Sequence, residues 1–76
     1  MNSVFIVTYQ FENEHNAHIL HVCSTADKAC EELDAYIAMF GEPIIEDYYE
    51  TLDEEYFFRH VETERLTCQI IEEDVI

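Results

Sequence analysis

Basic residues are nearly absent from this chain of 76 residues. Lys28, Arg59 and Arg65 stand against 18 acidic residues, and the formal net charge is −15. Direct binding to nucleic acid or to an anionic membrane surface is therefore unfavourable, because both depend on Lys and Arg. A charge of this size also repels itself in the compact state. The sequence indicates that something other than fold stability maintains the acidity.

Cysteines are few, odd in number and widely spaced. Cys23, Cys30 and Cys68 form no C-x-x-C motif, which argues against a disulfide framework and favours reduced, intracellular thiols. The N-terminal MNSVFIVTYQF has no basic region and is too short for a membrane span. We therefore expect a cytoplasmic protein with no membrane partner.

Glycine occurs once, and no glycine-rich or nest-like loop is present. Nucleophilic catalysis needs an activating base at close range and an oxyanion site. The three cysteines fall on an apolar helix stripe or on strand-like segments, as small core residues do. We expect no enzyme activity and no cofactor.

Three histidines follow an H-x-x-H-x-x-H pattern, His15, His18 and His21, with Cys23 nearby. Zinc uses such ligands. On a regular strand, however, His18 and His21 would point to opposite faces and could not share one ion. We expect partly exposed strand histidines and no metal site.

The first half of the chain predicts a hairpin followed by a helix. Val4–Phe11 has the β-branched and aromatic residues of a central strand, and Ala17–Cys23 of a returning one. Ser24 or Thr25 would cap a helix. Its apolar stripe recurs at three- and four-residue steps, and Gly41 and Pro43 would stop it; the stripe is Ala26, Ala29, Cys30, Leu33, Ile37 and Phe40.

The second half leaves one segment open. Ile44–Leu52 suits either a strand or a short helix that begins at Pro43. Tyr56–Glu62 and Leu66–Ile71 predict two paired strands, and the acidic end EEDVI is expected to be loose. Residues 1–76 thus predict a single α+β domain with one main helix packed on a small antiparallel sheet, in the order β-β-α-β-β, with segment 44–52 a strand or a short helix.

The stretch Glu42–Phe58 concentrates the charge. It holds seven acids and five aromatics and no Lys, Arg or His. Bulky apolar residues between the acids favour a folded surface, since disordered acidic tails lack aromatics. Alternate strand residues lie about 6.6 Å apart and helix neighbours about 5–6 Å apart, close to every second phosphate of one DNA strand. On a helix, Glu46/Glu50, Asp47/Glu50 and Glu31/Asp34 would be neighbours, whereas on a strand Glu46, Tyr48 and Glu50 would share a face.

The chain also resembles a group of small phage-encoded proteins. The resemblance rests on VFIVTYQF, on the S-T-x-x-x-A-x-x-x-L pattern of Ser24, Thr25, Ala29 and Leu33, and on YFFRHVE. Within that group, the charge balance is similar to that of the acidic anti-CRISPR and anti-restriction proteins that imitate DNA. This resemblance implies binding to a host nucleic-acid-binding protein, such as a CRISPR effector subunit or a restriction enzyme, in the host cytoplasm. It assigns no individual residue.

Two functional hypotheses follow. The first is an inhibitor, monomeric or a small homo-oligomer, that occupies the basic nucleic-acid groove of another protein, with tyrosines as anchors. The alternative is a structural or regulatory module that self-associates through a sheet edge without mimicry. Solubility or a halophilic origin would also produce the acidity. The candidate partner-binding residues are Glu31, Glu32, Asp34, Glu42, Glu46, Asp47, Tyr48, Tyr49, Glu50, Asp53, Glu54 and Glu55.

Overall fold

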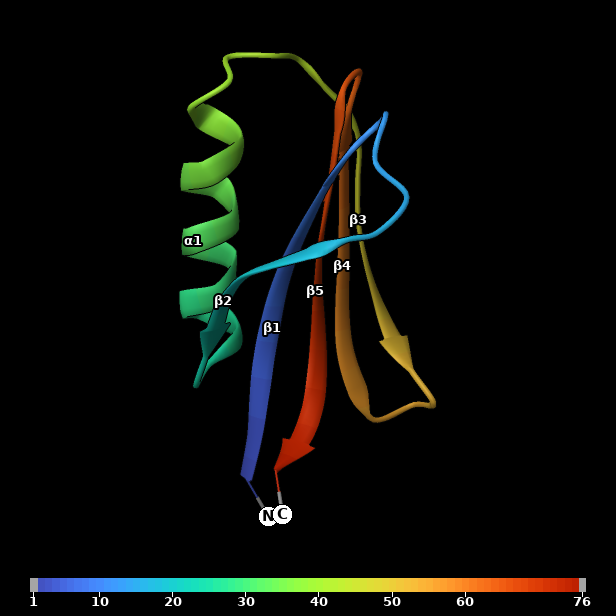
Figure 1. Ribbon diagram of the computed structural model, residues 1–76. Coiled ribbons are helices and arrows are strands. Elements are labelled where there is room, and N and C mark those ends of the chain that lie inside the picture. Colours follow the sequence, from blue (N-terminus) through green and yellow to red (C-terminus); the bar gives the residue numbers. More distant parts are fainter. Residues whose placement is uncertain (1, 76) are drawn as a thin grey trace.

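A computed structural model describes residues 2–75 as a five-stranded antiparallel sheet with one helix on one side (Figure 1). The α+β class is confirmed. The elements are β1 (Asn2–Phe11), β2 (His18–Cys23), α1 (Ala26–Ala38), β3 (Ile44–Leu52), β4 (Tyr56–Thr63) and β5 (Leu66–Val75). The strand order across the sheet is β2-β1-β5-β4-β3.

The C-terminal strand occupies the middle of the sheet, between β1 and β4. β1 pairs with β2 on one side and with β5 on the other, so the prediction that it is an interior strand is confirmed. The prediction of a loose acidic end is wrong, because β5 continues to Val75, which pairs with Asn2 of β1. The backbone hydrogen bonds of this ladder order a segment that its charge alone would leave in solvent.

Segment 44–52 is a strand, so the element order is β-β-α-β-β-β, one strand more than the shorter order expected. β3 pairs with β4 from Ile44↔Thr63 to Leu52↔Tyr56, with a bulge between Ile44 and Glu46. The local pattern fitted a helix equally well, and the hydrogen-bonding edge of β4 decides between them. The β4 partners lie from four positions (Leu52↔Tyr56) to 19 positions (Ile44↔Thr63) away along the chain, so most of them lie outside any local pattern.

Thr25 caps the helix, which begins at Ala26; the Thr25 hydroxyl accepts a hydrogen bond from the Lys28 N–H (3.1 Å). The helix ends at Ala38, two residues before Phe40, and Gly41 follows with φ +64°. A left-handed φ suits glycine and agrees with the predicted stop. Within residues 2–75, no helix has the length and apolar character needed to cross a membrane.

The core lies between α1 and one face of the sheet. Ala29, Leu33 and Ile37 from the predicted stripe are buried against Val7, Cys23, Val61, Leu66, Cys68 and Ile70. The helix contacts β5, β1 and β2. β3 forms the edge of the sheet that lies away from the helix, at the right in Figure 1.

A bulge in the first hairpin changes the histidine geometry. The β1–β2 register shifts between Val7 and Thr8, so that His21 pairs with Val7 and His18 with Tyr9. Val7 and Tyr9 share a face, and the prediction that His18 and His21 point to opposite faces is therefore wrong. Each has its own acidic neighbour: His18 Nε2 lies 2.7 Å from Glu14, and His21 Nε2 lies 3.0 Å from Glu32.

Candidate functional site

Arg59 of β4 is the charged centre of the sheet's helix side. Its residue is only 4% exposed, and its guanidinium donates to Asp47 of β3 (Nε–Oδ1 3.0 Å, Nη2–Oδ2 2.8 Å) and lies 2.9 Å from Asp34 of α1. The Tyr49 ring lies 5.1 Å below it. The hydrogen bond from Arg59 holds the pKa of Asp47 below its usual range. Asp34, Asp47 and Tyr49 therefore serve the packing of β3 and α1 around one cation.

The other two bases are paired at the surface. Lys28 Nζ lies 3.2 Å from Glu32 and 3.7 Å from Glu31, one helical turn away. Arg65 Nε donates to Glu42 (2.5 Å), which also accepts from the Thr63 hydroxyl. Five of the twelve candidate residues are thus acids that already face a base: Glu31, Glu32, Asp34, Glu42 and Asp47.

The remaining candidate acids lie on the β3–β4 hairpin. Among residues 2–75, no ion pair or side-chain hydrogen bond involves Glu46, Glu50, Asp53, Glu54 or Glu55. We call these five residues the hairpin acids. All five are exposed. The structure therefore divides the predicted site into acids that neutralise bases and acids that remain available.

Glu46, Tyr48 and Glu50 lie on the open face of the sheet, the face opposite α1. Tyr48 stacks on His60 with 5.1 Å between ring centroids. Asp47 points to the other side, toward Arg59, so the helix-like pairs Glu46/Glu50 and Asp47/Glu50 do not form. On a strand, Glu46 and Glu50 are separated by about 13 Å along the chain.

Like charges also meet across the open face. Glu46 pairs directly with Glu62 of β4, an arrangement that destabilises a sheet. Burial, and then the charges of Glu50, Glu46 and Glu62, raise the pKa of Tyr48. The carboxylates on this face therefore add to the effect of burial in disfavouring the ionised form of Tyr48.

The hairpin turn holds two acids at positive φ. Asp53 (φ +53°) and Glu54 (φ +61°) lie in the left-handed region, which Gly, Asn and Asp tolerate but which is unfavourable for Glu. The Glu55 N–H closes the turn on the Leu52 carbonyl (3.0 Å). Strained residues concentrate at functional sites.

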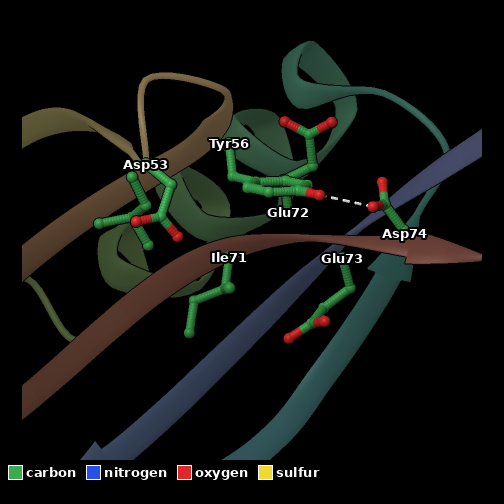
Figure 2. Close-up of a pocket in the computed structure, with 7 residues that line it drawn as sticks. Asp53, Tyr56, Ile71, Glu72, Glu73 and Asp74 are labelled. Carbon is green, nitrogen blue, oxygen red and sulfur yellow. Dashed lines mark hydrogen bonds between the residues drawn. The ribbon is translucent and has the colours of Figure 1, made fainter.

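Sequence reasoning missed three acids that join the hairpin in space. The end of β5 places Glu72, Glu73 and Asp74 around the same pocket as Asp53, and we call these four residues the acidic tip. In Figure 2, Asp53 and Glu72 lie on one side of β5 and Glu73 projects from the other. With Leu52, Tyr56 and Ile71 they line a pocket of about 340 Å³. The run EEDV was visible in the sequence, but nothing local placed it next to the hairpin.

The acidic tip raises the pKa of Tyr56, which lies next to it. Its hydroxyl donates to Asp74 Oδ2 at 2.5 Å, the dashed line in Figure 2. That hydrogen bond, with burial and the charges of Asp74, Glu55 and Glu72, raises the pKa of Tyr56 to about 12. Glu72 also accepts the Phe57 N–H (2.9 Å).

The arrangement of the described histidines, cysteines and acids does not favour a metal site or a reactive thiol. Among the described residues, no group of three or more His, Cys, Asp or Glu side chains could hold a metal ion. Cys23 and Cys68 are buried in the core and Cys30 packs against it, which confirms their predicted structural role. Burial raises the pKa of Cys68 to about 12, so its thiolate is disfavoured.

Comparison with known proteins does not narrow the function. No protein-family model, curated protein or solved structure matches this chain.

Proposed function

We propose that this protein binds the basic nucleic-acid groove of another protein and blocks it, as a mimic of nucleic acid. The observation that carries the proposal is the separation of charge. The three bases are paired with acids on α1, β3 and the loop before β3, whereas the hairpin acids and the acidic tip have no base among their contacts in residues 2–75. The β3 edge of the sheet, together with the acidic tip, thus presents carboxylates that no basic side chain neutralises.

Two features indicate that stability does not account for these acids. The Glu46–Glu62 pair places like charges opposite each other, and Glu54 keeps a left-handed backbone conformation that Gly or Asn would adopt at lower cost. An acid that only maintained solubility could stand at an unstrained position. Binding to a positive surface would account for both features, because charge complementarity at an interface raises specificity and the association rate.

The protein imitates the negative electrostatic field of nucleic acid and not the positions of individual phosphates. The separation of Glu46 and Glu50, about 13 Å, spans about four phosphates along the axis of one DNA strand. The expectation of one carboxylate for every second phosphate therefore does not hold on β3. Tyr48, between the two acids, supplies contact area at modest entropic cost.

Capture from a bacterial lysate tests the proposal. The immobilised protein should retain DNA- or RNA-binding proteins, and added duplex DNA should release them. Glu46→Lys with Glu50→Lys should abolish capture, whereas the control Glu12→Lys with Glu64→Lys makes the same charge change at two turns and should retain most of it. Retention of only neutral or acidic proteins, or equal loss with both double variants, would contradict the proposal.

A further inference from the structure

We infer that β3 receives an extended, basic segment of the partner as a sixth strand of the sheet. The inference rests on the basic partner of the proposed function and adds the mode of contact. Strand addition of this kind obtains affinity from backbone hydrogen bonds and specificity from alternate side chains.

β3 is an exposed edge that its own charges close to acidic strands but leave open to basic ones. It is the last strand in the order β2-β1-β5-β4-β3, and all nine of its residues are exposed. Natural edges are protected by charged side chains, Pro, bulges or short length. β3 contains no Lys or Pro, its bulge lies at one end between Ile44 and Glu46, and its only charges are the acids Glu46, Asp47 and Glu50. The other edge strand, β2, has six residues and a bulge in its ladder.

The exposed apolar side chains of β3 also favour contact with a partner. Ile44, Ile45 and Tyr49 are 50%, 64% and 58% exposed, on a strand that α1 does not cover. Large apolar side chains grouped on one exposed element mark interaction surfaces more than isolated ones do.

The acids of β3 determine which kind of strand can pair with this edge. On the open face, an added strand would meet Glu46, Tyr48 and Glu50, two unpaired carboxylates and a ring that attracts cations. On the other face Asp47 is already bonded to Arg59, and an added strand would meet Tyr49. The partner strand therefore carries Lys or Arg at alternate positions and apolar residues between them. A second copy of this chain would instead bring another acidic strand and another charge of −15.

The test uses a short peptide of alternating valine and lysine, with three lysines, and the same peptide methylated at every backbone nitrogen. The two have equal charge and side chains, but the second has no backbone donor. The unmethylated peptide should bind at least about tenfold more tightly and should slow hydrogen exchange of β3 amides. Glu46→Gln with Glu50→Gln should weaken its binding, and the control Glu12→Gln with Glu64→Gln should not.

Each other outcome overturns the inference in a distinguishable way. Equal binding of the two peptides without protection of β3 means that charge alone acts, and the proposed function stands without strand addition. Absence of binding by both rejects the basic strand, and the lysate experiment then decides the proposed function separately. A dimer in sedimentation, with β3 amides protected before any peptide is added, assigns the edge to a second copy.

Discussion

Arg59 shows how one buried residue can organise the acids around it. Its guanidinium joins α1, β3 and β4 through Asp34 and Asp47, although these residues are far apart in the sequence. Removing the cation would leave two neighbouring carboxylates, both partly exposed, without a counter-charge. Asp34 and Asp47 therefore stabilise the fold.

Arg59→Met should destabilise the protein strongly. Loss of one partner from a buried ion pair costs about 3–5 kcal/mol, and because Asp34 and Asp47 remain partly exposed we expect about 3 kcal/mol. The matched change Arg65→Met removes a pair whose arginine side chain is 65% exposed, and such pairs contribute less than about 1 kcal/mol. Urea denaturation of both variants measures the difference. Equal losses would contradict the assignment of Arg59 as the organising cation.

Tyr56 should be the last tyrosine to ionise. Its folded pKa of about 12 lies above its ordinary value of about 10. The hydrogen bond to Asp74 therefore contributes its full stability below about pH 10 and loses it as the pH rises through 12. Ultraviolet titration of tyrosinate should show a step near pH 12 that disappears in Tyr56→Phe. Asp74→Asn should move that step to lower pH; an unchanged step would show that Asp74 does not cause the shift.

At the scale of elements, the β3–β4 hairpin combines regular pairing with a strained turn. Its strands form a continuous ladder from Glu46 to Leu52, while Asp53 and Glu54 hold left-handed φ angles. Substitutions in this turn can therefore separate effects on stability from effects on binding.

Glu54→Gly should stabilise the fold by about 0.5–1 kcal/mol. Glycine relieves the left-handed strain, about 1–2 kcal/mol, and the greater freedom of the unfolded chain offsets part of the gain. Glu55→Gly removes the same charge at a residue without positive φ and should destabilise. Thermal unfolding distinguishes them, and a stabilising Glu55→Gly would indicate that charge relief dominates. If the acids serve binding, Glu54→Gly should also weaken capture of the partner.

At the scale of the whole molecule, the net charge should act in opposite directions on folding and binding. Acids crowded in the folded state repel each other more than in the expanded chain, so screening favours the fold. The Debye length falls from about 8 Å at about 0.15 M salt to about 3 Å at 1 M. Attraction to a basic partner is screened over the same range.

The melting temperature should therefore rise as sodium chloride increases to about 1 M, while partner binding weakens. Calorimetry and a binding titration at matched salt concentrations measure the two trends. Glu46→Lys with Glu50→Lys should leave folding intact or improved and should reduce the salt dependence of the melting temperature. Unfolding of that variant would mean that these acids serve the structure.

The sequence by itself determined the helix, the strands other than β3, and the surplus of charge. The three- and four-residue stripe placed α1, with Ala29, Leu33 and Ile37 buried as predicted. The β-branched and aromatic segments placed β1, β2, β4 and β5, and composition alone marks Glu42–Phe58 as the acidic, aromatic segment. These features are local, since the period of a helix or strand is written in neighbouring residues.

Only the tertiary structure decided which acids are free. Tertiary packing joins residues far apart in the chain. The sequence therefore did not show that Arg59 would form ion pairs with Asp34 and Asp47. Nor did it show that Glu72–Asp74 would line the same pocket as Asp53. A single bulge, which no local pattern marks, placed His18 and His21 on one face. The charge of this protein is a property of its composition, whereas the separation of paired from unpaired acids depends on long-range packing.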